Sequence, residues 1–81
     1  MAKTWIEGRL GFNCDNDRYG LLVSDLWENN GFHCGQTFQV NVDGEWVDTR
    51  MEMRFPNEWY LVDTPYSGNL EYVKARIQKE V

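Results

Sequence analysis

Side chains that build catalytic and metal centres are scarce in this chain. It contains one histidine and two cysteines, with neither a Cys-x-x-Cys pair nor a phosphate-binding glycine loop. A cysteine nucleophile needs its histidine base within about 3 Å in a fixed direction, which neighbours in sequence rarely achieve. Paired carboxylates such as Asp15 and Asp17 stand in a turn-forming segment, where a solvated role is favoured over acid–base catalysis. We therefore expect a protein that is not an enzyme.

Long apolar runs are absent as well. No segment approaches the roughly 20 apolar residues that span a bilayer, and residues 1–7 lack the apolar stretch of a secretory signal. A cytoplasmic location is therefore expected. In that reducing compartment a disulfide between Cys14 and Cys34 is disfavoured, and a thiol or a metal thiolate is favoured.

Basic residues are the minority charge. Eight Lys and Arg stand against 13 Asp and Glu, which gives a net charge of −5 at pH 7. Residues 25–58 hold seven of the acids and only two arginines. A concentrated negative field repels phosphate backbones, so it favours a basic nucleic-acid-binding protein as partner over nucleic acid itself. The alternative is an acidic surface that serves solubility alone.

Aromatic residues, by contrast, are abundant. The chain is expected to form one domain, residues 1–81, and a domain of this size buries only about 60–65% of the surface of its unfolded chain. Four Trp, four Tyr and four Phe offset this small size, because each of these side chains buries roughly 150–250 Å². A compact core with some aromatic rings left outside is predicted.

Alternation of apolar and polar residues is the recurrent pattern, and it is typical of strands. Residues 4–12 alternate in this way, and a turn-rich stretch then leads to the β-prone run 19–23, which predicts a hairpin. Further strands are predicted at 58–63 and 72–79. Asp25, followed three residues later by Glu28, resembles a capping box and predicts one short helical turn.

The dipeptide Asp43-Gly44 predicts a further hairpin, because both residues suit the positive φ angles of a type I′ turn. If Val42 lies opposite Glu45, Trp46 falls on the outer face. The inner face is then predicted to hold Phe38, Val40, Val42, Val47, Met51 and Met53. The fold class is predicted to be all-β, a small five- or six-stranded barrel of SH3-like or OB-like type with one short helical turn, because closure removes exposed edges.

One constellation has the chemistry of a metal site. Cys14, His33 and Cys34 supply thiolate and imidazole ligands from two predicted loops, and Asp15 or Asp17 can complete a tetrahedral zinc site of structural type. His33 and Cys34 share a metal only if the segment around them is a turn, which the flanking glycines permit. The alternative is a buried Cys34, a partly exposed His33 and an inert Cys14.

The second candidate is an interaction surface on the hairpin. Aromatic rings beside carboxylates suit the recognition of Arg and Lys side chains. The predicted partner-binding residues are Asp43, Glu45, Trp46, Asp48 and Glu52.

Three segments carry a family resemblance: HCGQTFQV at 33–40, GEWVDTRME at 44–52 and WYL at 59–61. They resemble a family of short domains of unknown function carried by phages and other mobile elements of bacteria. The resemblance implies a small β-barrel without an assigned activity. Acidic mobile-element proteins of this size are similar in general character to anti-CRISPR inhibitors, which occupy basic surfaces of Cas nucleases in the infected bacterial cell.

The expected function is therefore a phage-type inhibitor that binds a basic surface of a host nuclease, possessing no catalytic activity and stabilised by zinc if the metal site forms. One alternative is an accessory module for single-stranded nucleic acid, in which Lys74, Arg76 and Lys79 contact phosphates. A small zinc-dependent enzyme is the other alternative.

Overall fold

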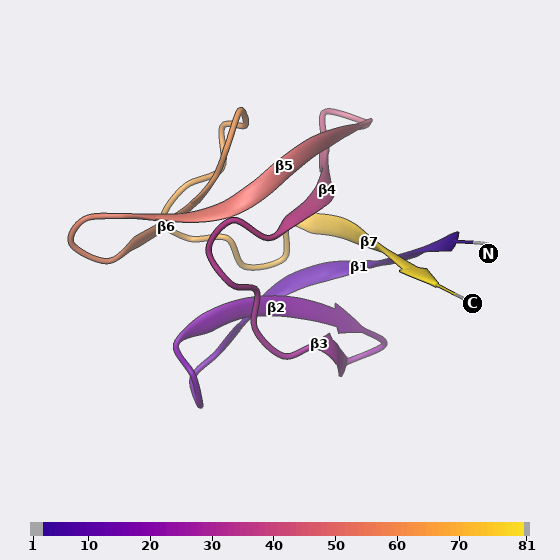
Figure 1. Ribbon diagram of the computed structural model, residues 1–81, viewed down its shortest axis with the longest axis horizontal. Helices are drawn as coiled ribbons and strands as arrows, with labels where there is room; N and C mark the ends of the chain where they lie inside the picture. The colour runs from indigo at the N-terminus through magenta and orange to yellow at the C-terminus, as the bar shows by residue number, and fades with distance from the viewer. Residues whose placement is uncertain (1–2, 81) are drawn as a thin grey trace.

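The computed structural model describes residues 3–80, in which seven strands form one sheet in the order β3-β2-β1-β7-β4-β5-β6. Every neighbouring pair is antiparallel. The strands are β1 (Lys3–Asn13), β2 (Arg18–Val23), β3 (Leu26–Asn29), β4 (Thr37–Val42), β5 (Glu45–Arg54), β6 (Glu58–Leu61) and β7 (Lys74–Glu80). Figure 1 shows β4, β5 and β6 lying above β1, β2 and β3. Within the described range, no helix has the length and apolar character needed to cross a membrane.

β1 is the longest strand and pairs with strands on both of its sides. It pairs with β7 from Lys3 to Arg9 and with β2 from Arg9 to Asn13. Gly8 stands beside this change of partner, where an added Cβ would meet the carbonyl oxygen of Leu22 at 2.1 Å. Only glycine permits so close an approach of two backbones, so Gly8 lets β2 cross β1 at this point.

The hairpin predicted around Asp43-Gly44 is confirmed. β4 and β5 pair along all of β4, and Val42 lies opposite Glu45 as expected. Asp43 and Gly44 have φ angles of 52° and 91°. Positive φ at both central residues is what a type I′ turn requires, so the register of this hairpin follows from its turn.

The inner face of the hairpin is confirmed in part. Phe38, Val40 and Met51 are buried, and Val42 and Val47 are half-buried. Met53, however, is 39% exposed. The prediction fails for Met53, which lies near the end of β5, where the β5–β6 hairpin extends beyond the rest of the molecule at the left of Figure 1.

The predicted helical turn after residue 24 is wrong. Ser24 and Asp25 have φ angles of 52° and 64°, which is the backbone of a hairpin turn rather than of a helix cap. Leu26 then pairs with Val23, and β3 forms an edge strand in place of the helix. Glu28 accepts a hydrogen bond from the ammonium group of Lys79 at 2.8 Å instead of capping a helix. The strand count is consequently seven rather than five or six.

The predicted closure into a barrel is also wrong. β3 and β6 end the strand order, and within residues 3–80 they have no register with each other. Two connecting segments protect the core instead: Phe32 comes from the segment between β3 and β4, Leu70 comes from the segment between β6 and β7, and both are 0% exposed. Side chains from loops can cover a strongly twisted open sheet, so closure is not needed to exclude water.

Side-chain hydrogen bonds tie the two ends of the sheet together. The Tyr19 hydroxyl donates to the carbonyl oxygen of Gly68 at 3.4 Å and accepts from the Leu70 N–H at 3.3 Å. The Trp59 indole Nε1–H donates to the carbonyl oxygen of Asp17 at 3.2 Å. The buried core comprises Leu10, Tyr19, Leu21, Phe32, Phe38, Val40, Met51, Trp59, Leu61, Leu70 and Ala75.

Candidate functional site

The surface of β1, β7, β4 and β5 that faces away from this core carries a connected set of polar and aromatic side chains. We call it the outer face and define it by Trp5, Gln39, Trp46, Asp48 and Arg76. The sheet register brings these residues together, because Gln39 lies opposite both Arg76 on β7 and Asp48 on β5. Alternation along each strand then places their side chains on one side of the sheet.

Arg76 is the centre of this set. Its guanidinium carbon lies 4.2 Å from the ring centroid of Trp5 and 4.3 Å from that of Trp46, so the cation is placed between two indole rings. Each such contact contributes about 0.5–1 kcal/mol at a partly exposed position. Trp46 is therefore half-buried against Arg76 rather than free, while Trp5 remains 38% exposed.

A chain of hydrogen bonds leads from Arg76 to Asp48. The Arg76 Nε–H donates to Gln39 Oε1 at 2.8 Å, and Gln39 Nε2 donates to Asp48 Oδ1 at 2.7 Å. The Gln39 amide is thus oriented by a donor on one side and an acceptor on the other. Asp48 is exposed and belongs to none of the ion pairs found among residues 3–80. Its second carboxylate oxygen is available to a donor from outside.

Two grooves meet at Asp48. The larger, which we call the β4–β7 groove, has a volume of about 580 Å³ and is lined by residues that include Trp5, Thr37, Asp48, Ile77 and Gln78. Of the described residues that line it, Asp48 alone is charged. The surface offers amide and hydroxyl groups, aromatic area and one carboxylate, a composition suited to a ligand rich in N–H donors.

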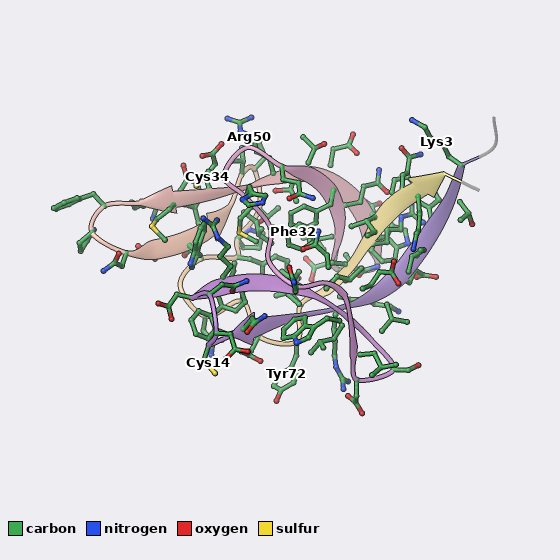
Figure 2. All side chains as sticks on the ribbon, turned by 60° about the horizontal axis from the view of Figure 1, so that its bottom comes forward. Lys3, Cys14, Phe32, Cys34, Arg50 and Tyr72 are labelled. Carbon is green, nitrogen blue, oxygen red and sulfur yellow. The ribbon has the colours of Figure 1, made fainter. Side chains whose placement is uncertain are left out.

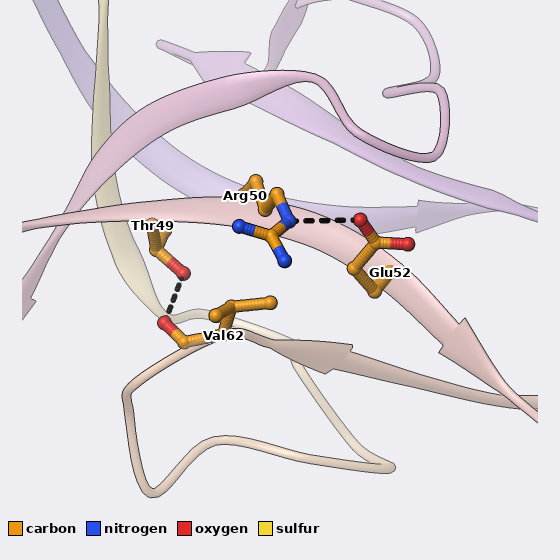
Figure 3. Close-up of polar contacts among 4 residues, drawn as sticks. All are labelled: Thr49, Arg50, Glu52 and Val62. Atoms are coloured by element: carbon orange, nitrogen blue, oxygen red, sulfur yellow. Dashed lines mark hydrogen bonds and ion pairs between the residues drawn. The ribbon is translucent and has the colours of Figure 1, made fainter.

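The smaller groove has a volume of about 210 Å³ and runs between β5 and the segment after β6, with Asp48 and Asp63 among its lining residues. Figure 3 shows how this segment is fixed: the Thr49 hydroxyl donates to the carbonyl oxygen of Val62 at 2.7 Å. Thr49 is buried, with 6% of its surface exposed, so this bond is shielded from water. The groove wall is consequently held in place from the core.

The remaining predicted partner-binding residues are placed differently from Asp48. Glu52 accepts a hydrogen bond from the Arg50 Nε–H at 2.9 Å, so part of its charge is compensated (Figure 3). Asp43 and Glu45 are exposed at the β4–β5 turn. Since Glu45 lies opposite Val42, its side chain is on the opposite side of the sheet from Asp48. The structure therefore joins Trp46 and Asp48 in one site and leaves the other three residues around it.

The structure does not gather the predicted metal ligands. Cys14 and Asp15 lie in the β1–β2 turn, whereas His33 and Cys34 lie in the segment between β3 and β4. Figure 2 shows the two cysteines at well separated places on the molecule. Within the part of the chain that the structure describes, no group of three or more His, Cys, Asp or Glu side chains is placed to hold a metal ion. Both thiols are exposed, so the alternative with a buried Cys34 is wrong.

The three cations that phosphate binding would use have different surroundings. Lys74 and Arg76 are two residues apart on β7 and therefore share one side of the strand, whereas Lys79 lies on the other side. Arg76 is stacked between tryptophans, and Lys79 Nζ forms an ion pair with Glu28 Oε2 at 2.8 Å. Lys74 is exposed and lines a separate groove near Arg9. Arg76 and Lys79 therefore already have partners among residues 3–80.

Trp5, Gln39 and Arg76 were not singled out as partners of Trp46 from the sequence. Alternation predicts that Trp5 points outward on its strand. The neighbourhood itself depends on β7 lying between β1 and β4, and nothing in the local sequence reports this strand order.

A family model described as a domain of unknown function, DUF5348, matches residues 8–77. No curated protein and no solved structure matches the chain. The family match includes four of the five residues of the outer face, with Trp5 lying just before it. Because the match extends over most of the 81 residues, from β1 to β7, the protein belongs to the DUF5348 family.

Proposed function

We propose that the protein is a non-catalytic binding module that uses its outer face to hold a basic surface of another protein. The observation that carries this proposal is Asp48, an exposed carboxylate that lines two grooves and takes part in none of the ion pairs of residues 3–80. Its Oδ1 is already held by Gln39. An oriented carboxylate loses less freedom on binding, and guanidinium or ammonium groups are the donors that it binds best.

Charge and aromatic area support the same partner chemistry. A net charge of −5 draws cationic surfaces toward the protein and raises the rate of encounter. Trp5 is 38% exposed beside the β4–β7 groove, where its indole can receive an Arg or Lys side chain. A carboxylate flanked by aromatic area is a combination that protein interfaces use at their energetic centres.

Within this proposal, the partner is a host nuclease and the protein acts as a phage or mobile-element inhibitor of the anti-CRISPR type. A nuclease holds nucleic acid through Lys and Arg side chains, and an acidic module that occupies those side chains blocks loading of the nucleic acid. The family has no assigned function, so it does not support this specific role. The support comes from the net negative charge of the chain and from the Lys and Arg side chains with which nucleases hold nucleic acid.

The test compares proteins retained from a bacterial lysate containing candidate nucleases by the wild-type chain and by Asp48→Asn. We expect the substitution to weaken retention of a basic protein by about three- to tenfold at roughly 0.15 M salt, because one oriented charge is lost at the interface. The retained protein is then purified, and its nucleic-acid loading is measured with and without the chain. Loading is expected to fall in the presence of the wild type.

Asp15→Asn is the matched control, because it removes the same charge from the exposed β1–β2 turn. It should leave retention of the basic protein nearly unchanged. An equal loss of retention in the two variants would show that retention depends only on the net charge of the chain. Unchanged retention in Asp48→Asn would exclude the outer face as the binding surface.

A further inference from the structure

The sheet splits where β4 and β7 part. Register pairs join these two strands only at Gln39 with Arg76 and at Val40 with Ala75. β4 nevertheless begins at Thr37, and β7 continues to Glu80. The β4–β7 groove lies between these diverging ends, so it opens into the sheet itself rather than into a loop region.

The backbone along this split is a template for another strand. Successive N–H and C=O groups of an antiparallel strand are directed alternately toward its two neighbours. β7 uses one set to pair with β1 as far as Lys3 opposite Glu80. Beyond Arg76, the other set faces the groove, and within residues 3–80 the register gives it no strand partner. Exposed backbone groups of this kind are what an added strand pairs with.

The two sides of the groove differ in chemistry. Phe38 and Ile77 line it from the core side of the sheet, and both are apolar. Asp48 and Gln78 line it from the outer face. Because side chains of a strand point alternately to the two faces, a strand in the groove would direct every second residue toward Asp48 and the others toward Phe38 and Ile77.

We propose that the β4–β7 groove receives an extended segment of the partner protein, which adds a strand between β4 and β7 and alternates basic with apolar residues. The inference rests on the proposed function and names the form of the partner. The segment is expected to carry basic residues because Asp48, a carboxylate, is the one charged side chain among the described residues that line the groove. The stretch from Ile77 to Glu80 accommodates about four residues of such a segment, or roughly 13 Å of strand.

The test uses the synthetic peptide Lys-Val-Lys-Val-Lys-Val-Lys, with blocked ends, as the probe. Binding is followed by the fluorescence of the wild-type chain, whose Trp5 lines the groove. Amide hydrogen exchange is measured with and without peptide. We expect exchange to slow by at least about tenfold at those backbone amides of 77–79 that face the groove, because new main-chain hydrogen bonds protect them. Amides of the β1–β2 turn serve as the internal control and should not change.

Two control peptides separate strand pairing from charge attraction. A version with N-methyl groups on alternate residues keeps the charge but lacks the main-chain donors along one edge of the strand, and it should bind about tenfold more weakly. A version with Glu in place of Lys should not bind, because Asp48 and the net charge repel it. Equal binding of the methylated and unmethylated peptides, or no slowing of exchange in 77–79, would overturn the added strand.

The outcomes also separate this inference from the function on which it rests. If Asp48→Asn reduces retention of the basic protein while the peptide leaves the amides of 77–79 unprotected, the outer face is the binding surface and the added strand is excluded. If the peptide protects these amides and the retention of basic protein is insensitive to Asp48→Asn, the groove binds strands but the proposed function fails.

Discussion

At the scale of single residues, Arg76 shows that a charged side chain of the outer face can be structural. It lies between Trp5 and Trp46 and orients Gln39, which in turn orients Asp48. Alternation along the strand predicts that Trp46 is on the outer surface, and Arg76 covers part of its ring there. What remains outside is a carboxylate with one oxygen already held, which is a more specific feature than an acidic patch.

Gly8 provides the first stability prediction at the scale of residues. Replacing Gly8 with Ala places a Cβ against the carbonyl oxygen of Leu22 at 2.1 Å, so backbone must move. We expect Gly8→Ala to lower the free energy of unfolding by about 3 kcal/mol, measured by urea denaturation.

Gly44→Ala is the control for Gly8→Ala. An added Cβ at Gly44 meets nothing within 4 Å, but the residue has a φ of 91°. Its cost is therefore limited to backbone strain of about 1–2 kcal/mol. A smaller loss for Gly8→Ala than for Gly44→Ala would show that the close approach of β2 to β1 is not maintained.

At the scale of elements, hairpins differ in how well local sequence specifies them. Asp43-Gly44 is a strong signal for a type I′ turn, and the β4–β5 register was predicted correctly from it. Ser24-Asp25 adopts positive φ at both positions without a glycine. The local sequence therefore favours a helix cap at Asp25 and gives no signal for β3. Pairing with β2 outweighs the local preference for a helical turn in this segment.

The segment that follows β6 is attached to β5 by a hydrogen bond, and this bond gives a prediction at the same scale. In Thr49→Val the buried hydroxyl that donates to the Val62 carbonyl oxygen at 2.7 Å is lost, while the side-chain shape is kept. We expect a loss of about 1–2 kcal/mol in the free energy of unfolding, because the carbonyl group loses its partner in a shielded position. Thermal and urea denaturation both report this change.

Thr37→Val makes the same chemical change at an exposed position of β4. Its effect should stay within about 0.5 kcal/mol, as for other surface substitutions. Comparable losses in the two variants would mean that the Thr49 hydrogen bond does not stabilise the segment after β6.

At the scale of the whole molecule, loop residues complete a core that the open sheet cannot enclose. Phe32 is 0% exposed, and its ring centroid lies 4.4 Å from that of Phe38 on β4. We expect Phe32→Ala to cost about 3–5 kcal/mol. Since a domain of 81 residues is marginally stable, this loss should leave much of the protein unfolded at 37 °C, as circular dichroism would report.

Phe55→Ala is the matched control for the whole-molecule prediction, because Phe55 is 93% exposed at the tip of the β5–β6 hairpin. It should leave the unfolding transition nearly unchanged. If Phe32→Ala were tolerated equally well, the segment between β3 and β4 would not be part of the core.

The sequence by itself determined the features that depend on near neighbours in the chain. Alternation assigned the strands an inner and an outer side, and Asp43-Gly44 set the register of β4 against β5. The acidic excess in residues 25–58, which include Trp46, is likewise evident from the order of residues alone. These properties follow from strand geometry and turn conformation, which act over a few residues.

Only the tertiary structure decided which strands became neighbours. β7 lies between β1 and β4, and this order brings Arg76 between Trp5 and Trp46 and opens the β4–β7 groove. The tertiary structure also places Cys14 and Cys34 far apart on the molecule (Figure 2). Strand order and the covering of the sheet by Phe32 and Leu70 depend on contacts between residues far apart in sequence, whose free energies no local pattern reports.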